Sequence, residues 1–257
     1  MMKRKYFFFD IDGTLGLKLT MKMPADTSYT IKQLMRRGHF VAMATGRGQA
    51  DAARVAEKYG IPSFVADGGN SLTWNGKLLK IEPLPLEKSK SVLHALENSG
   101  IPWAVITDNS IVLRTTYAYF RNPAYSAFTQ YSGQISKDGT IDGIRSVFKI
   151  FFTRPPEEKM PDLGGLPLIP YLNDLVLIEP VHKEKGIKDL MGILKAPLED
   201  VVVFGDGMND ISMFTEPFFR IAMGNGREEL KKIADYVTDR NDAGGIFHAC
   251  LKFGWLQ

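Results

Sequence analysis

The sequence is poor in the residues that build disulfide frameworks and soft-metal sites. Its 257 residues include one cysteine, Cys250, so an internal disulfide and a cysteine-rich zinc site are both excluded. The four histidines show no paired ligand spacing; they are His39, His94, His182 and His248. Any metal ion bound by this chain is therefore expected to have oxygen ligands. A single cysteine also fits a reducing compartment.

Long apolar runs are absent as well. No stretch approaches the roughly 20 apolar residues that a transmembrane helix needs. Lys3, Arg4 and Lys5 precede an apolar run, as in a signal peptide, but this run breaks at Asp10 and no small-residue cleavage site follows. We therefore predict a cytoplasmic protein without a membrane partner.

The chain has little excess charge of either sign. Its formal net charge is +3, and the basic clusters at 183–188 and 231–232 are short. A nucleic-acid partner is therefore not expected. A Walker A sequence is absent, and Gly224-Asn225-Gly226 lacks the third glycine of a dinucleotide-binding fingerprint.

What the sequence does contain is a series of apolar runs that each end in polar residues. The runs cover residues 6–9, 39–44, 63–66, 201–204 and 218–223. The polar residues that follow them are Asp10 and Asp12, Thr45, Asp67, Asp206 with Asn209 and Asp210, and Asn225. Continuous apolar runs are typical of parallel strands buried on both faces. Because helical patterns alternate with these runs, we predict an α/β fold with a doubly wound parallel sheet of Rossmann-like type.

The middle of the chain departs from this rhythm. Pro83 and Pro85 indicate a hinge, and the strands expected after them are less uniformly apolar. From Lys185 the strand and helix alternation returns. We therefore predict a core domain made of residues 1–82 and 183–257, with an inserted α+β cap domain at residues 83–182.

In open α/β sheets, ligands bind beyond the carboxyl ends of the strands, so the polar clusters are expected to converge. Convergence would crowd the carboxylates of Asp10, Asp12, Asp206 and Asp210 together, and without a cation some of them would have to be protonated. A hard divalent cation resolves this repulsion, and carboxylates with few nitrogen ligands favour Mg²⁺ over Zn²⁺.

A magnesium ion held by carboxylates, with threonine and lysine donors nearby, suits a phosphoryl group. One carboxylate can act as a nucleophile, and a second can protonate the leaving oxygen and activate water. Thr45 could donate to a phosphate oxygen, and Lys185 could neutralise developing charge. Taken alone, Asp-x-Asp-Gly also fits a strand followed by a tight turn, and Lys185 also fits a solvated surface lysine.

Four ordered motifs resemble those of the haloacid dehalogenase superfamily, with the closest likeness to the Cof-type sugar-phosphate phosphatases. They are Asp10-Ile-Asp12-Gly-Thr-Leu15, Thr45-Gly46-Arg47, Lys185-Gly186 and Gly205-Asp206-Gly-Met-Asn209-Asp210. Ala222-Met-Gly-Asn225 and Asn241-Asp-Ala-Gly-Gly245 resemble later segments of the same subgroup. Each motif is weak alone, but four in order around an insertion are specific.

The resemblance implies a role for each matched residue. Asp10 would be the nucleophile and a Mg²⁺ ligand. Asp12 would be the general acid and base and would give its backbone carbonyl to the metal, while Asp206 would complete the protein ligands. The phosphate-binding residues would be Thr45, Gly46, Lys185 and Asn209. Asp210 would orient its neighbours, and Arg47 would face the cap or the substrate.

Two positions refine the resemblance. P-type ATPases share the aspartyl nucleophile but place threonine two residues after it, where this chain has Asp12; an aspartate there favours rapid hydrolysis of the phosphoenzyme. Asp67-Gly68-Gly69 stands where Cof-type relatives often have Asn-Gly-Ala. Asp67 could alter substrate preference or cap a turn, and we favour the turn.

The sequence thus predicts a Mg²⁺-dependent phosphatase that hydrolyses a small phosphorylated metabolite, with a sugar phosphate as the favoured class, through an aspartyl-phosphate. A phosphomutase of the same superfamily is the enzyme alternative. A phosphometabolite-binding regulator without catalysis is the alternative outside enzymes. The sequence does not indicate an oligomeric state.

Overall fold

The structure, a computed structural model, describes residues 3–18, 20–121, 135–136, 140–171 and 174–256. The chain divides into two compact units. A core unit consists of residues 1–46, 52–80 and 181–257, and an inserted unit consists of residues 47–51 and 81–180. The sequence predicts these boundaries at 82/83 and 182/183, but it does not predict that residues 47–51 group with the insertion.

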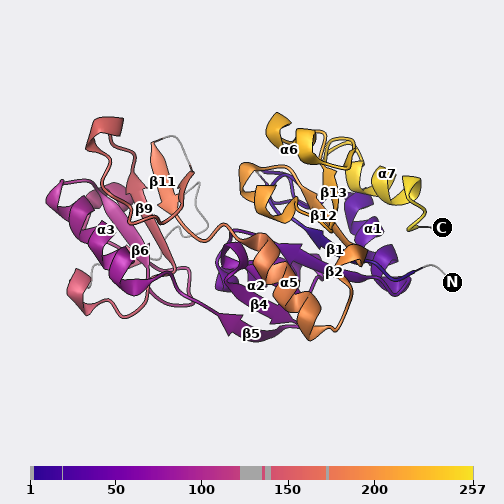
Figure 1. Ribbon diagram of the computed structural model, residues 1–257, viewed down its shortest axis with the longest axis horizontal. Helices are drawn as coiled ribbons and strands as arrows, with labels where there is room; N and C mark the ends of the chain where they lie inside the picture. The colour runs from indigo at the N-terminus through magenta and orange to yellow at the C-terminus, as the bar shows by residue number, and fades with distance from the viewer. Residues whose placement is uncertain (1–2, 19, 122–134, 137–139, 172–173, 257) are drawn as a thin grey trace. The chain divides into compact units, whose positions relative to one another are not determined.

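The core unit is built on an eight-stranded sheet (Figure 1). Its strands, in sheet order, are β14 (Tyr236–Val237), β13 (Phe219–Ala222), β12 (Val201–Gly205), β1 (Tyr6–Phe9), β2 (Phe40–Ala44), β3 (Phe64–Ala66), β4 (Ser71–Trp74) and β5 (Lys77–Ile81). From β14 to β3 every neighbouring pair is parallel, whereas β3 and β4 are antiparallel. This sheet confirms the predicted α/β fold class.

Strand β1 shows why the parallel strands are apolar throughout. Phe7 and Phe9 pack on one face of the sheet and Phe8 on the other, and all three side chains are fully buried. Helices cover both faces, so none of these three side chains faces solvent. The first face packs against α1 (Ala25–Arg36), α2 (Gln49–Tyr59) and α7 (Gly245–Lys252), and the second against α5 (Lys183–Ile193) and α6 (Glu228–Ile233).

Two local features bear on the predictions. The Asn75-Gly76 pair within residues 72–81 predicts a β-hairpin. Strands β4 and β5 are joined at Asn75 and Gly76, which have φ values of 48° and 77°, and this confirms the hairpin. The sequence pattern predicts a helix over residues 186–194, but helix α5 begins three residues earlier, at Lys183. This shift brings a different lysine to the carboxyl edge of the sheet.

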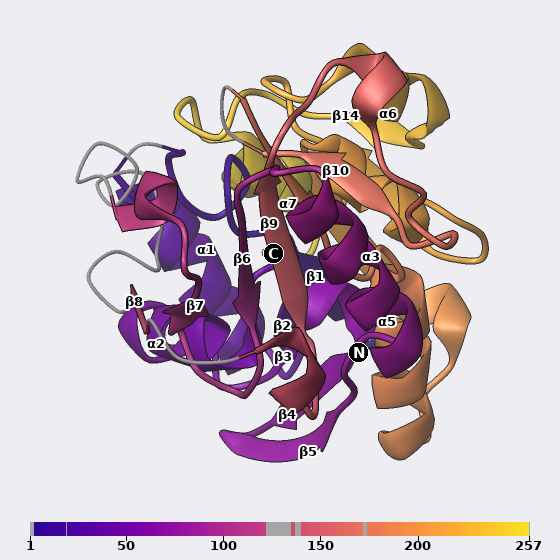
Figure 2. The same ribbon diagram turned by 90° about the vertical axis from the view of Figure 1, so that its left-hand side faces the viewer.

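The inserted unit has its own six-stranded sheet (Figure 2). Its strands, in sheet order, are β10 (Leu168–Pro170), β11 (Leu175–Ile178), β9 (Lys149–Thr153), β6 (Trp103–Ile106), β7 (Leu113–Arg114) and β8 (Ile135–Ser136). Helix α3 (Leu86–Asn98) packs on one face through Val92, Leu93 and Leu96. This unit is the α+β insertion that the sequence predicts.

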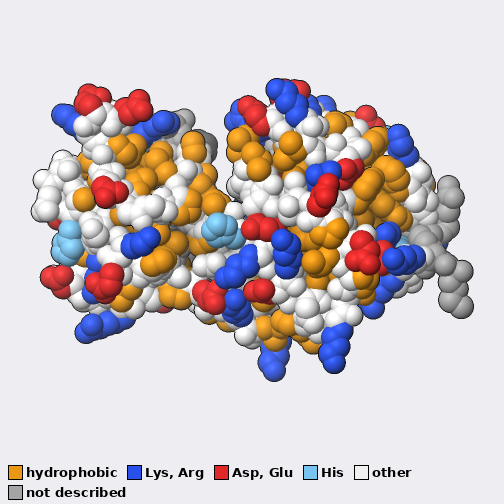
Figure 3. Space-filling model, in the orientation of Figure 1, with side chains coloured by type: hydrophobic (Ala, Val, Ile, Leu, Met, Phe, Trp, Pro, Cys, Tyr) orange, Lys and Arg blue, Asp and Glu red, His pale blue; other side chains and the backbone are white. Residues whose placement is uncertain are grey.

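Charge on the surface is mixed. On the face shown in Figure 3, acidic and basic side chains are interspersed without a large block of one sign. Among the described residues, no helix combines the length and the hydropathy that a membrane span requires.

Candidate active site

The site begins with two carboxylates at the ends of neighbouring strands. Asp10 follows β1 and Asp206 follows β12, and these two parallel strands pair directly through Phe9 and Phe204. The backbone N–H of Asp10 continues the ladder by donating to Phe204 O over 2.9 Å. The two carboxylates are therefore brought together by sheet pairing, and both are almost fully buried, at 4% and 1% exposure.

A third carboxylate, Asp210, lies in the 3₁₀ turn Met208–Met213 that follows β12. Its Oδ2 accepts hydrogen bonds from the backbone N–H groups of Asp206 (2.9 Å) and Gly207 (2.8 Å). Ligand oxygens of Asp10, Asp206 and Asp210 lie within 4.8 Å of one another. Asp210 is fully buried and fixes the backbone that carries Asp206.

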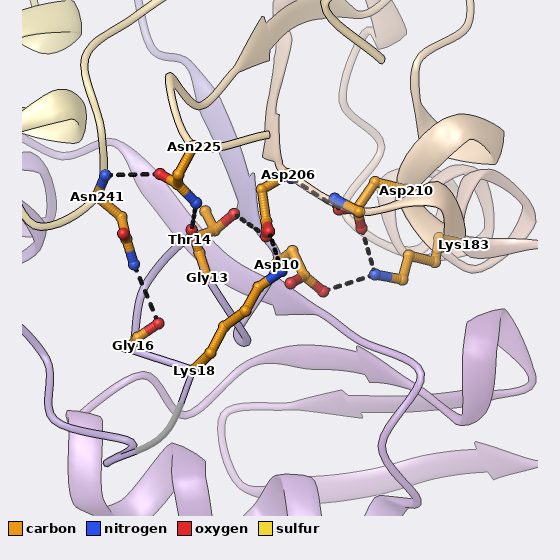
Figure 4. Close-up of polar contacts among 11 residues, drawn as sticks. Asp10, Gly13, Thr14, Gly16, Lys18, Lys183, Asp206, Asp210, Asn225 and Asn241 are labelled. Atoms are coloured by element: carbon orange, nitrogen blue, oxygen red, sulfur yellow. Dashed lines mark hydrogen bonds and ion pairs between the residues drawn. The ribbon is translucent and has the colours of Figure 1, made fainter. Parts of the chain in front are cut away.

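The cation that joins these carboxylates is Lys183. Its Nζ donates to Asp10 Oδ1 over 2.7 Å and to Asp210 Oδ1 over 2.6 Å (Figure 4). The sequence motifs predict Lys185 as the phosphate-binding lysine, but in the structure Lys183 is the lysine that contacts these carboxylates. Lys185 is exposed, because two residues along an α-helix turn its side chain about 200° away from that of Lys183.

A signal for Lys183 was present in the sequence. Lys183, Gly186, Ile187 and Leu190 follow the spacing i, i+3, i+4, i+7, which places them on one helical face. All four are buried in the structure. Lys183 therefore extends the buried stripe of α5 toward the strand ends, whereas Lys185 lies outside it.

Burial and mutual repulsion control protonation in this cluster. Burial, followed by the charge of Asp210, raises the pKa of Asp10 well above its usual value, although Lys183 opposes the shift. Burial and Asp210 also raise the pKa of Asp206. Burial alone would lower the pKa of Lys183, but Asp10 and Asp210 outweigh it and raise that pKa, so the lysine stays charged.

Thr45 and Lys183 are connected through the backbone of the loop after β3. Gly68 N–H donates to Thr45 O (3.1 Å), and His182 N–H donates to Gly68 O (2.7 Å). Thr45 is 1% exposed at the end of β2. Asp67 precedes this link in a 3₁₀ turn and has a left-handed φ of 48°.

The loop after β1 carries the remaining acid. Asp12 is half-buried and pairs with Gly16 in an isolated bridge, and Gly13 between them turns with a φ of 97°. Thr14 Oγ1 donates to Asp206 Oδ1 over 3.2 Å. The exposed Lys18 reaches the same carboxylate, with its Nζ 2.9 Å from Asp206 Oδ2. Sequence reasoning missed both contacts, which depend on the path of the loop.

The other predicted residues lie in different surroundings. Asn209 is half-buried in the 3₁₀ turn that contains Asp210. Gly46 follows β2 and is the last residue of the core unit before residues 47–51, which belong to the inserted unit. Arg47 groups with the inserted unit and pairs with Asp51, at 2.7 Å between Nη1 and Oδ2.

The donor set fits a hard divalent cation. The clustered ligand atoms are all carboxylate oxygens, without histidine or sulfur. The raised pKa values of Asp10 and Asp206 show that a further positive charge would favour the ionised forms of these two carboxylates. Both oxygens of Asp210 already accept hydrogen bonds from Lys183 and from backbone N–H groups. The Oδ2 of Asp206 is contacted by the exposed side chain of Lys18, which a bound cation could displace, whereas the partners of Asp210 are a buried lysine and backbone groups. Asp10 and Asp206 are therefore better ligand candidates than Asp210.

A parallel α/β sheet with buried acids and a buried lysine at its carboxyl edge defines the class of protein. A family model described as haloacid dehalogenase-like hydrolase matches residues 7–162 and 170–250. The chain belongs to the haloacid dehalogenase-like hydrolases, as its motifs predict.

Several relatives match over nearly the whole chain. YkrA of Bacillus subtilis is 29% identical over 261 residues, covering 100% of both chains. In the same organism, 5-amino-6-(5-phospho-D-ribitylamino)uracil phosphatase YwtE is 24% identical over 273 residues, covering 94% of this chain and 95% of its own. The structure of the HAD subclass IIB sugar phosphatase BT4131 matches with a TM-score of 0.81 at 24% identity, covering 98% of this chain and 99% of its own. The family and the curated relatives indicate that this enzyme is a phosphatase, and the likeness to the BT4131 structure shows the shared fold.

Proposed function

We propose that this phosphatase hydrolyses a small phosphorylated metabolite through an aspartyl-phosphate on Asp10, with Mg²⁺ as its cofactor. The observation that supports this most strongly is the buried cluster in which Lys183 contacts both Asp10 and Asp210 beside Asp206. Burying three carboxylates and one ammonium costs free energy that a purely structural role does not recover easily. Binding of a divalent cation by the carboxylates and of a phosphoryl group by Lys183 would account for this arrangement.

The first step forms a covalent intermediate. An oxygen of the Asp10 carboxylate attacks phosphorus, and the bond between phosphorus and the ester oxygen breaks. Asp12 in its protonated form gives its proton to the departing alcohol oxygen. Lys183 and Thr45 hold the phosphoryl oxygens, with Gly46 and Asn209 as further contacts.

The second step returns the enzyme to its starting state. Asp12, now ionised, takes a proton from a water molecule that attacks the aspartyl-phosphate. The acyl phosphate bond breaks, inorganic phosphate leaves and the Asp10 carboxylate is restored. Asp210 keeps Asp206 and Lys183 in place through both steps.

Asp10, Asp206 and the backbone carbonyl of Asp12 would hold Mg²⁺. When bound, the ion supplies positive charge that stabilises the carboxylates and the phosphoryl oxygens.

We propose a sugar phosphate or a related polyol phosphate as the substrate class. The names of BT4131 and YwtE support this, since the first is a sugar phosphatase and the second acts on a phosphoribityl compound. A polar metabolite of this kind also fits a cytoplasmic location for the enzyme.

The test is release of inorganic phosphate from a panel of phosphorylated sugars, polyols, nucleotides and cofactors, with Mg²⁺ or with EDTA. We expect release that EDTA abolishes and that is highest for sugar or polyol phosphates. No release from any member by folded protein would contradict the proposal. Release that requires a bisphosphate activator would indicate a mutase instead.

Two variants test the assigned chemistry. Asp10→Asn should reduce turnover by at least about 10³-fold, since the nucleophile is lost. Asp12→Asn should still accept the phosphoryl group but release it slowly, so that phosphoenzyme accumulates in an acid quench. Asp142→Asn, at a side chain that is 85% exposed in the inserted unit, is the matched control and should keep wild-type rates. Near-normal activity in Asp10→Asn would show that another residue is the nucleophile.

A further inference from the structure

Asn225 and Asn241 lie in the segments 222–225 and 241–245, for whose residues the resemblance implies no role in the reaction. The side-chain amide of Asn225 makes two hydrogen bonds to backbone groups. Its Nδ2 donates to Gly13 O over 2.8 Å, and its Oδ1 accepts from Asn241 N–H over 2.8 Å (Figure 4). A backbone carbonyl can only accept and a backbone N–H can only donate, so these partners fix the orientation of the amide.

Asn241 extends the connection to the other end of the same loop. Its Nδ2 donates to Gly16 O over 3.2 Å, and the residue is 5% exposed. Gly13 N–H donates to Gly16 O (2.9 Å), and Gly16 N–H donates to Ile11 O (2.8 Å). The two asparagines therefore bind the two ends of a tight loop that begins directly after Asp12.

The segment that carries Asn225 is also attached to the backbone of Asp206. Arg227 N–H donates to the backbone carbonyl of Asp206 over 2.9 Å. A Cβ on Gly226 would lie 3.2 Å from Asp206 Cα, so the two backbones are in close contact. Residues 225–227 thus contact both the loop of Asp12 and the backbone of Asp206.

We infer that Asn225, supported by Asn241, is a positioning residue that sets the place of Asp12 relative to Asp206. This inference rests on the proposed function, because it gives Asp12 the role of general acid and base. Leu15 packs in the core, but Gly13 and Gly16 at the two ends of this loop have no side chains that could fix the backbone, and the two asparagines bind at these positions. A displacement of about 1 Å at a reacting group costs on the order of 10²-fold in rate.

The chemistry of the site requires an amide at position 225. Asn225→Asp keeps an oxygen that can accept from Asn241 N–H, but it replaces the Nδ2 donor by a second oxygen facing Gly13 O. Two acceptors then face each other, and the loop loses its attachment. This variant loses the hydrogen bond to Gly13 O and keeps the one from Asn241 N–H. It therefore tests the bond to Gly13 without disrupting the contact between residues 225 and 241.

The first measurement is amide hydrogen exchange by NMR in wild type, Asn225→Asp and a control. The control is Arg220→Gln, which removes the ion pair with Asp235 near the other end of β13, the strand that precedes Asn225. We expect the amides of Gly13 and Gly16 to exchange at least about tenfold faster in Asn225→Asp, with the amides of β1 unchanged. The control should leave Gly13 and Gly16 protected. Unchanged exchange in Asn225→Asp would overturn the inference.

The second measurement is steady-state kinetics on the best substrate of the panel. We expect kcat of Asn225→Asp to fall about 10- to 100-fold with KM within about threefold, because Thr45 and Lys183 lie on other elements. Arg220→Gln should keep the wild-type kcat. Faster loop exchange with a normal kcat would overturn the positioning role. If the wild type releases no phosphate at all, the proposed function fails, and hydrogen exchange alone then decides whether Asn225 holds the loop.

Discussion

At the scale of single residues, Lys183 has the most demanding environment. It is 1% exposed and is held by two buried carboxylates, so its removal leaves Asp10 and Asp210 without their counter-charge. Lys183→Gln should lower the free energy of unfolding by about 3–5 kcal/mol and kcat/KM by at least about 10²-fold. Urea unfolding and phosphate release measure the two effects.

The matched control is Lys185→Gln, two residues further along the same helix. Because Lys185 is exposed, its substitution should change stability by less than about 0.5 kcal/mol and leave kcat/KM within about twofold. Lys183→Arg serves if Lys183→Gln does not fold, since it keeps the charge but not the shape of the ammonium group. A larger loss in Lys185→Gln than in either variant of Lys183 would return the phosphate-binding role to Lys185.

His39 is a second residue with an unusual environment. Its Nδ1 accepts the backbone N–H of Lys5 over 3.0 Å, and the ring packs edge-on against Phe7. Burial, followed by the charges of Arg37, Arg4 and Lys5, lowers its pKa below the usual 6.5, although a backbone hydrogen bond with Trp255 opposes the shift. Protonation at Nδ1 would also replace this acceptor by a donor.

Stability should therefore depend on pH through His39. Since the folded pKa is lowered, the unfolded state binds more protons between that value and 6.5, and stability rises with pH in this window. The contribution is complete above pH 6.5 and is lost as the pH falls below it. Urea midpoints between pH 5 and 8 should show a steeper rise in wild type than in His39→Gln. Equal slopes would show that His39 does not titrate differently in the two states.

Strand-end carboxylates such as Asp10 and Asp206 are predictable from the sequence, because a buried parallel strand fixes where its last side chain lies. The sequence predicts Lys185 as the active-site lysine, whereas the structure has Lys183 there. Lys183 belongs to the buried face of α5 only because the helix begins at this residue, and helix boundaries are poorly defined by local sequence. The contacts of Asn225 and Lys18 join segments that are distant in sequence, and the hydrogen bonds appear only after folding.

At the scale of secondary structure, helix α5 depends on one close contact with β3. A Cβ on Gly186 would overlap Val65 Cγ1 and lie 2.9 Å from Gly69 O. Gly186→Ala should push the helix away from the sheet, displace Lys183 and cost about 1–3 kcal/mol of unfolding free energy. We expect kcat to fall at least about tenfold, as measured by phosphate release.

Gly192 in the same helix provides the comparison. Among the described residues, no atom other than those of the adjacent residues and the helix's own backbone lies within 4 Å of a Cβ placed there, and the residue is exposed. Gly192→Ala should therefore stabilise the protein by about 0.5–1 kcal/mol through helix propensity, without an effect on kcat. If both alanine variants behaved alike in thermal unfolding, close packing of α5 on β3 would not be what positions Lys183.

Elements with strong patterns were the ones that the sequence predicted well. The apolar strands and helix α2 (Gln49–Tyr59) have clear periodicity and glycine boundaries, and the structure confirms them. After β12 the sequence pattern predicts a helix from about Ile211, but the structure has the 3₁₀ turn Met208–Met213 there. The carboxylate of Asp210 accepts backbone N–H groups there, and local propensity does not reveal such a turn.

At the scale of the molecule, each unit has hydrophobic cores of its own. The core unit packs on both faces of its parallel sheet, and the inserted unit packs on both faces of its six-stranded sheet. Unfolding should therefore occur in two transitions rather than one. In calorimetry, Mg²⁺ with orthovanadate should raise the transition of the core unit, because the candidate site lies there, and should leave the other in place. EDTA should reverse the increase.

A variant in the inserted unit identifies the second transition. Lys149 and Glu179 form a buried ion pair in this unit, with side chains 4% and 7% exposed. Lys149→Met leaves the Glu179 carboxylate buried without this partner, which costs about 3–5 kcal/mol. We expect the transition that does not respond to Mg²⁺ and orthovanadate to move to lower temperature, while the responsive one stays unchanged. A single transition that moves with both treatments would show instead that the two units unfold as one cooperative body.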